Sequence, residues 1–338
     1  MTAPDARRPV TGLASAPPAG TRPRASTTAP ATSAGARVAL DIECFGVRFQ
    51  NPMLLAAGTA GFGREVARVI DVEALGGIVT KAVSVEPRRG NPSPRVAELP
   101  GAMLNSVGLA NPGLDAFRSE KLPWLRRRVR ARVLVNVVGN AVADFATVVA
   151  ALADEPCIAA FELNVSCPNV EHGGLEFGAD DAVLAQLVRL ARAATAKPLL
   201  VKLSPVLPDP ARTARAAAAA GADAFTTVNT LPAKAYDAHG KSRLGAGSGG
   251  LSGPPLLPVG VKVARLVARG TGKPVIGVGG IRTGADALQY LEAGASLVAV
   301  GTAALADPRA PERIVRELAQ LLARRGARAL HDVIGTGT

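Results

Sequence analysis

Aromatic side chains, cysteines and long apolar runs are all scarce in this sequence. Aromatic residues make up only 3% of the 338 positions, so Ala, Val and Leu must fill the core, which favours helices packed on a parallel sheet over an aromatic-rich β-sandwich. The three cysteines, Cys44, Cys157 and Cys167, show no CxxC spacing. This excludes a disulfide framework and a four-cysteine zinc or iron–sulfur site within this chain, and no metal is expected. The scattered cysteines indicate a reducing, cytoplasmic setting. No run of about 18 apolar residues occurs, so we expect no membrane association.

The formal net charge of +12 raises the possibility of a nucleic-acid partner. The arginines, however, are spread along amphipathic segments such as 124–128 and 323–325, without interleaved aromatic residues that could stack on bases. A solvated, arginine-rich surface explains the charge better than a nucleic-acid-binding module. A positive field would also suit a substrate or cofactor that carries anionic groups.

Residues 1–36 differ in composition from the rest of the chain. They are mostly Ala, Pro, Ser, Thr and Gly, and their few charges are nearly all Arg. Such a segment cannot bury enough apolar surface to offset its ordering entropy. It superficially resembles a transit peptide, but we expect a dispensable disordered tail, followed by one domain over residues 37–338.

From residue 38 onward the sequence becomes periodic. Alternation over 38–49 predicts a short β-hairpin, and apolar runs of strand length then alternate with helix-length amphipathic segments, the last at about 309–325. This pattern predicts a (β/α)8 TIM barrel, with an open doubly wound sheet as the alternative. The predicted strands are 53–59, 76–82, 132–139, 158–166, 198–204, 223–230, 273–279 and 297–302.

A weak recurrence accompanies these strands. The segments 75–81, 220–226 and 293–299 each place a glycine before an apolar strand. We expect each glycine to end a helix in the left-handed conformation that glycine adopts without steric cost.

Active sites of TIM barrels lie at the carboxyl ends of the strands. Buried polar groups are costly without partners, so several of them ending apolar strands indicate a bound polar ligand. The strand ends carry Thr59, Lys81, Asn136, Asn164, Lys202, Asn229, Gly279, Gly280, Gly301 and Thr302.

The glycines that end the last two predicted strands, within 277–280 and at 301–302, suit a phosphate site. Arg282 stands where a dinucleotide fingerprint would have its third glycine, so a mononucleotide such as FMN is indicated instead.

The segment 162–170, Glu-Leu-Asn-Val-Ser-Cys-Pro-Asn-Val, places Cys167 among polar residues at the expected catalytic rim. A cysteine there can act as base, nucleophile, metal ligand or inert packing. No well-placed histidine partner is evident, since His172 reads as a loop residue. We therefore favour a general base over a protease-like nucleophile.

Several motifs occur together and in order: 81–95, 103–113, 164–169, 201–205, 228–230 and 250–254. Over residues 38–335 the sequence resembles the dihydroorotate dehydrogenase family. The resemblance implies oxidation of dihydroorotate to orotate in de novo pyrimidine (UMP) biosynthesis, with one FMN in the barrel mouth. It is closest to class 1, in which a cysteine is the base, whereas the membrane-associated class 2 uses serine. Cys167 would then remove the C5 proton while hydride passes from C6 to FMN.

A free thiol has a pKa of about 8.5, so the site must favour the thiolate or activity must rise with pH.

The resemblance also implies the binding residues, of which Lys202 would stabilise charge on the reduced flavin. The residues implied for substrate are Lys81, Asn105, Ser106, Val107, Gly108, Leu109, Asn164, Asn229 and Thr230. Those implied for FMN are Ala57, Gly58, Lys81, Ala82, Asn136, Asn164, Lys202, Val228, Gly253, Gly279, Gly280, Gly301 and Thr302. One departure is Ala57, where a small hydroxyl residue is expected.

The loop 169–178 and the segment 121–125 look most like class 1B, the NAD-linked form. That likeness implies a homodimer that pairs with an electron-transfer subunit carrying FAD and a 2Fe–2S cluster, a heterotetramer in all. The alternatives are a fumarate-dependent class 1A enzyme and a related FMN barrel acting on another pyrimidine. A phosphate-binding isomerase or aldolase barrel is a further, non-redox alternative.

Overall fold

The computed structural model describes residues 38–166, 168–169 and 175–338, all of which fall in one compact unit, Ala36–Thr338. The predicted tail 1–36 lies outside the described residues.

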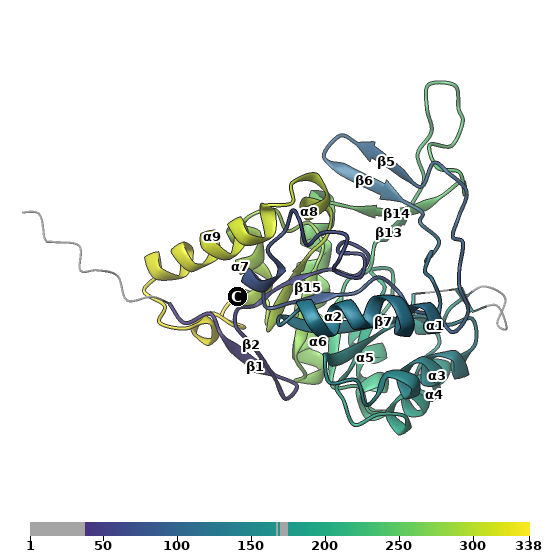
Figure 1. Ribbon diagram of the computed structural model, residues 1–338. Coiled ribbons are helices and arrows are strands. Elements are labelled where there is room, and N and C mark those ends of the chain that lie inside the picture. The colour runs from purple at the N-terminus through teal and green to yellow at the C-terminus, as the bar shows by residue number, and fades with distance from the viewer. Residues whose placement is uncertain (1–37, 167, 170–174) are drawn as a thin grey trace, which may run out of the picture. The chain divides into compact units, whose positions relative to one another are not determined.

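Eight parallel strands close into a barrel, which confirms the (β/α)8 architecture (Figure 1). All eight predicted strands are present, and each is shorter than predicted because its polar or glycine end leaves the sheet to form the barrel mouth. Around the barrel they are β3 (Met53–Leu55), β4 (Gly77–Val79), β7 (Arg132–Val137), β8 (Ile158–Asn164), β11 (Leu199–Leu203), β12 (Ala224–Thr227), β15 (Val275–Val278) and β16 (Leu297–Val300).

Helices pack around the outside of the barrel. The last of them confirms the predicted helix at 309–325 and buries Ile314, Leu318 and Leu322 along one face. None of the helices in the described part of the chain is long and apolar enough to cross a membrane. The α-helices are α1 (Leu114–Ala116), α2 (Leu122–Arg128), α3 (Val142–Leu152), α4 (Asp181–Ala193), α5 (Pro210–Ala219), α6 (Leu257–Thr271), α7 (Gly284–Glu292), α8 (Thr302–Ala306) and α9 (Ala310–Arg324).

The interval between β3 and β4 was wrongly expected to hold an α-helix. It consists of turns and one 3-10 helix, Val72–Ala74. Gly61 and Gly63 have φ of 58° and 90°, and a Cβ on Gly63 would lie 2.9 Å from the Trp124 ring. The chain therefore turns at these glycines, close against α2, where a helix was expected.

The glycine recurrence is confirmed in two of its three places. Gly221 and Gly294 have φ of 113° and 105°, whereas Gly76 lies outside the positive-φ region. Gly76 is required for a different reason, because a Cβ there would lie 2.1 Å from the carbonyl oxygen of Asn51.

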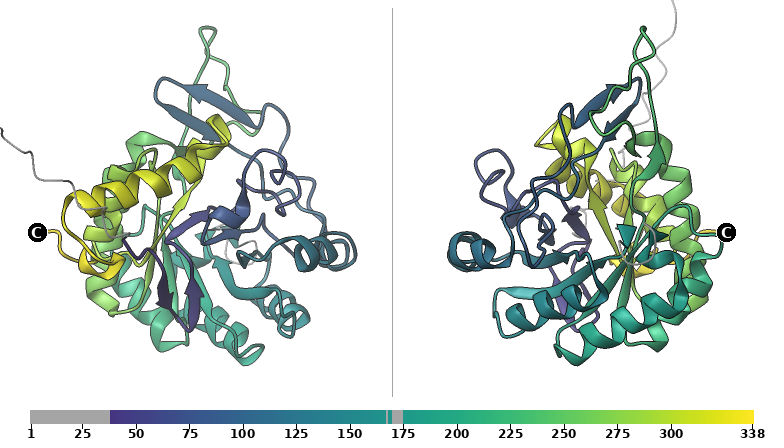
Figure 2. Two further views of the ribbon diagram at one scale, coloured as in Figure 1. Left: turned by 60° about the vertical axis from the view of Figure 1, so that its left-hand side comes forward. Right: turned by 90° about the vertical axis from the view of Figure 1, so that its right-hand side faces the viewer.

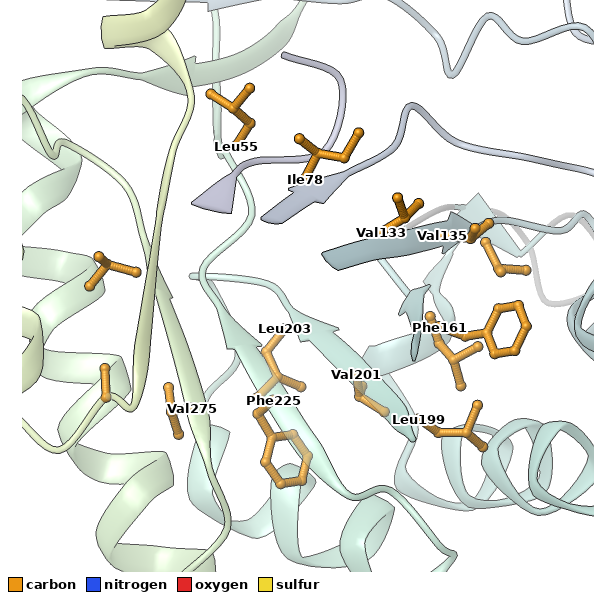
Figure 3. Close-up of a cluster of buried hydrophobic side chains, with 14 of the residues drawn as sticks. Leu55, Ile78, Val133, Val135, Phe161, Leu199, Val201, Leu203, Phe225 and Val275 are labelled. Carbon is orange, nitrogen blue, oxygen red and sulfur yellow. The ribbon is translucent and has the colours of Figure 1, made fainter. Parts of the chain in front are cut away.

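Strand residues alternate between two apolar clusters. Leu199, Val201 and Leu203 of β11 belong to the cluster between the strands and the helices, part of which Figure 3 shows. Leu200 of the same strand belongs to a second cluster, which fills the barrel interior with inward residues of the other strands. The inward position that follows Leu200 is Lys202, so the interior turns from apolar to polar toward the carboxyl ends of the strands.

The predicted N-terminal hairpin closes the other end of the barrel. It comprises β1 (Ile42–Cys44) and β2 (Val47–Phe49), and its buried Cys44 and Phe49 join the interior cluster. Apolar packing at this end leaves the carboxyl ends of the strands as the open end.

A four-stranded antiparallel sheet is inserted at that open end, on the side of the barrel away from the hairpin (Figures 1 and 2). Its strands are β5 (Val96–Leu99) and β6 (Ala102–Asn105), which follow β4, and β13 (Leu231–Ala233) and β14 (Gly249–Ser252), which follow β12. The register pairs Asn105 with Gly250. Segments far apart in the sequence thus meet beside the barrel mouth.

Candidate functional site

A polar layer lies directly above the apolar interior of the barrel. Asn136, Glu162, Lys202 and Thr226 occupy inward positions near the carboxyl ends of four neighbouring strands, and all are at most 6% exposed. The strand register places Asn136 opposite Glu162 and Lys202 opposite Thr226. The prediction that polar strand ends converge is confirmed for this part of the mouth.

Glu162 is the centre of this layer. Its Oε1 accepts a hydrogen bond from Asn136 Nδ2 at 2.7 Å, and its Oε2 accepts one from Thr226 Oγ1 at 2.6 Å. The Lys202 ammonium lies 4.0 Å from Oε1, which is an ion pair but too long for a hydrogen bond. No hydrogen-bond acceptor for Lys202 Nζ is found among the described residues, so its donors remain available to a ligand.

A second polar cluster joins β8 to the end of β12. Asn229 Nδ2 donates to Asn164 Oδ1 at 3.3 Å, and Asn229 Oδ1 accepts from the backbone N–H of Thr230 at 2.9 Å. Asn164 is 7% exposed, and Asn229 and Thr230 are half-buried. The structure thus brings together three of the residues implied for the substrate.

The segment 105–109 reaches this cluster through the inserted sheet. Asn105 Nδ2 donates to the carbonyl oxygen of Gly250 at 3.3 Å, and a Cβ on Gly250 would lie 1.9 Å from Thr230 Oγ1. Glycine is therefore required where β14 crosses Thr230. Ser106 Oγ accepts a hydrogen bond from Asn91 Nδ2 at 2.7 Å, and Leu109 has a positive φ of 55°. Lys81 lies on the turn that follows β4, and its side chain is half-buried.

The glycines predicted for a phosphate lie after β14, β15 and β16. Gly253, Gly279 and Gly280 have φ of 100°, 120° and 74°, and no acceptor for the N–H of Gly279 or Gly280 is found in the described chain. Thr302 Oγ1 donates to Ser252 Oγ at 2.8 Å, which joins the start of α8 to β14. Backbone donors and a hydroxyl from separate elements therefore gather at one side of the mouth.

The residues present fit a flavin mononucleotide. Gly58 has φ of 83°, and a Cβ there would meet nothing within 4 Å, so open space lies against this backbone. A Cβ on Gly301 would make only ordinary contacts, at 3.7 Å from Ala56 and Thr59. Lys202 supplies a buried cation with available donors. Ala82 and Val228 add buried apolar surface, and Ala57 is half-buried.

Cys167 and His172 lie outside the described residues. The chain is described up to Ser166, and Pro168–Asn169 (β9) pairs with Leu175–Glu176 (β10). Burial raises the pKa of the Glu176 carboxyl, an effect that a hydrogen bond with Ser204 opposes. Among the described residues, no group of three or more His, Cys, Asp or Glu side chains could hold a metal ion.

A groove of about 890 Å³ at the hairpin end of the barrel is not part of this site. Its lining includes Arg48, Arg126 and Arg132, and Arg48 and Arg126 form ion pairs with Asp41 and Glu155. Two of the four arginines that line it are paired in this way, and the apolar interior separates the groove from the polar layer.

Glu162 and Thr226 were missed by the sequence-based prediction. The available signal was an acid at an inward position of an otherwise apolar strand, two residues before Asn164. That signal becomes specific only once the barrel closes and shows which side chains face Glu162.

Residues 39–322 match the model of the dihydroorotate dehydrogenase family. The chain belongs to this family. It is therefore a flavin-dependent oxidoreductase, in agreement with a mouth that fits FMN. The non-redox isomerase or aldolase alternative is thereby excluded.

Similar proteins agree on the family and differ in class. The chain is 42% identical over 297 residues, 88% of this chain and 97% of the relative, to the dihydroorotate dehydrogenase B (NAD(+)), catalytic subunit, of Geobacter sp. (strain M21). It is 44% identical, over the same shares, to the protein of that name from Geobacter sulfurreducens. It is 48% identical over 292 residues, 86% of this chain and 96% of the relative, to a putative dihydroorotate dehydrogenase A (fumarate) of Solibacter usitatus.

Proposed function

We propose that this chain oxidises dihydroorotate to orotate in pyrimidine biosynthesis, with Cys167 as the base. The observation that supports this most strongly is the buried Lys202 ammonium at the barrel mouth, which is paired with Glu162 and has no hydrogen-bond acceptor among the described residues. A buried cation with spare donors is costly in a protein that binds nothing there.

The cofactor would be held along one side of the mouth. Gly58, Ala82, Asn136 and Val228 would line the ring, with Ala57, Lys81 and Asn164 beside them, and Lys202 would stabilise negative charge that develops on it. When bound, FMN supplies a two-electron acceptor for hydride. The residues proposed to hold its phosphate are Gly253, Gly279, Gly280, Gly301 and Thr302.

The substrate would bind against the asparagine cluster. Asn164 and Asn229 present amide groups that both donate and accept, which matches the alternating N–H and C=O groups of a dihydropyrimidine ring. Lys81 would offset the substrate carboxylate. The segment 105–109 and Thr230 would complete the pocket from the inserted sheet.

The proton would be taken by Cys167. As a thiolate, its sulfur would accept the C5 proton, and the electron pair of that C–H bond would form the C5=C6 double bond as the hydride leaves C6. The thiol must then release its proton before the next turnover.

We propose that NAD is the electron acceptor. Electrons would reach it through a partner subunit that carries FAD and a 2Fe–2S cluster. Two catalytic chains would form a homodimer within a cytoplasmic heterotetramer. Relatives named as NAD-linked catalytic subunits support this assignment. Fumarate is the second candidate, because a relative at 48% identity is named a putative fumarate enzyme.

Anaerobic mixing of the purified yellow chain with dihydroorotate tests the proposal. We expect the flavin absorbance to bleach and to stay bleached with NAD until the partner subunit is added. Reoxidation by fumarate alone would instead favour the second candidate. A yellow protein that does not bleach would overturn the substrate assignment.

A further inference from the structure

Glu162 has no part in the chemistry described above, yet it is among the most deeply buried charged groups of the described chain, at 1% exposure. Its inward position on β8 follows that of Ala160, which belongs to the apolar interior cluster. A carboxylate in this place is costly unless its oxygens are satisfied.

Two hydrogen-bond donors and one cation, from three other strands, satisfy it. Asn136 of β7 and Thr226 of β12 each hydrogen-bond one oxygen, and Lys202 of β11 lies 4.0 Å away. Both hydrogen bonds are short and fully buried. Glu162 is thus the shared acceptor that fixes how these strands present their polar side chains to the mouth.

The first consequence concerns Asn136. An ionised carboxylate only accepts hydrogen bonds, so the Asn136 amide must turn its NH2 group toward Glu162. Its carbonyl oxygen is then the group left for a ligand, and no donor to that oxygen is found among the described residues. A neutral amide at position 162 would allow either orientation of Asn136.

The second consequence concerns Lys202. At 4.0 Å the carboxylate stabilises the ammonium by charge without using one of its N–H donors in a hydrogen bond. In a site with little water this attraction is stronger than at the surface. Lys202 is therefore held in place beside the carboxylate, with its donors directed elsewhere.

We propose that Glu162 is a positioning residue, which acts on the flavin chiefly through the charge of Lys202 and to a smaller extent through the amide orientation of Asn136. The inference rests on the proposed function, because it requires FMN in the mouth. It adds a residue that touches neither cofactor nor substrate and still sets how tightly the cofactor is bound.

A double-mutant cycle separates this role from a structural one. Glu162→Gln keeps the shape of the side chain and removes its charge, and Lys202→Met removes the group through which it acts. We expect Glu162→Gln to weaken FMN binding to the purified chain about tenfold, the loss of roughly one charge-assisted interaction. In the Lys202→Met background the same change should cost about twofold or less. Glu162→Gln should shift the flavin absorption spectrum when Lys202 is present and should not shift it in the Lys202→Met background.

Equal losses in the two backgrounds would overturn the inference, because they would show a general packing role. An unchanged affinity in Glu162→Gln would overturn it as well. If Glu162→Gln does not fold, Thr226→Val serves in its place: it frees one oxygen of Glu162, and a smaller loss, again confined to the background that keeps Lys202, is expected. A wild-type chain that binds no FMN would overturn the proposed function itself, a result distinct from an uncoupled cycle.

Discussion

The hydroxyl of Tyr290 on α7 lies 2.9 Å from the carbonyl oxygen of Val278 and 2.8 Å from that of Gly279. Tyr290 is completely buried, and burial raises the pKa of its phenol, so the hydroxyl stays protonated and donates. A Cβ on Gly277 would lie 2.2 Å from the Tyr290 ring. One buried side chain therefore fixes the start of the glycine turn to which we assign the phosphate.

Replacing Tyr290 with Phe should loosen this turn. The carbonyl oxygen of Gly279 loses its donor, and that of Val278 keeps only the N–H of Val228, so we expect a loss of about 1–3 kcal/mol in the free energy of unfolding. FMN affinity should fall by roughly threefold to tenfold as the turn becomes mobile.

Chemical denaturation and flavin fluorescence measure the two effects. The matched control is Tyr236→Phe, because Tyr236 is the other tyrosine and is 58% exposed. Equal effects of the two changes would contradict the role assigned to Tyr290.

Changing Cys167 to Ser should separate cofactor binding from chemistry. A serine hydroxyl ionises far less readily than a thiol, so FMN should remain bound while flavin reduction by dihydroorotate slows by roughly 10²–10⁴-fold at neutral pH. Stopped-flow absorbance under anaerobic conditions gives the rate. Cys157→Ser, at the hairpin end of the barrel, should reduce at the wild-type rate. Near-normal reduction in Cys167→Ser would remove the base assignment.

The barrel could be predicted from sequence because each strand carries a local signal. Residues 199–203 are a mostly apolar run that follows a helix and precedes a polar residue. An α-helix precedes six of the eight strands, the exceptions being β3 and β4. The strand ends were placed too late, because the polar and glycine residues that end each predicted run lie in the mouth, where the backbone has already left the sheet.

The site could be predicted less completely. Asn136, Asn164 and Lys202 were identified from their strand-end positions, but the pairing of Asn136 with Glu162 depends on the strand register, which no local pattern encodes. The missing helix after β3 had a similar cause, because the ring of Trp124 that crowds Gly63 is distant in sequence.

Removing residues 1–36 should leave FMN content and dihydroorotate oxidation unchanged. The family match begins at residue 39, and the site is built from residues beyond that point. Activity and flavin content of the shortened chain, compared with those of the full chain at equal concentration, check this. A shortened chain that is colourless, or that no longer responds to the partner subunit, would assign residues 1–36 a structural or partner-binding role.

The stability of the hairpin end should depend on alkaline pH through Cys44. Burial, and to a smaller extent the charge of Glu43, raises the pKa of this thiol from 9.0 to about 12. The folded chain therefore keeps the thiol neutral, while the unfolded chain ionises it above pH 9. The contribution is complete below the unfolded pKa and is lost as pH rises from 9 toward 12. For pH 10 the loss is about 1.4 kcal/mol.

Denaturant unfolding at pH 8 and pH 10 measures this difference. Cys44→Ala should lower stability at pH 8 by about 1 kcal/mol, because a buried side chain is shortened. It should not lose the Cys44 contribution between pH 8 and pH 10, so at pH 10 it should be about as stable as the wild type. Cys157→Ala provides the comparison: burial raises the pKa of Cys157 as well, but this thiol is only half-buried, so its removal should change the pH dependence less. If Cys44→Ala lost as much stability between pH 8 and pH 10 as the wild type, Cys44 would not be the group that titrates.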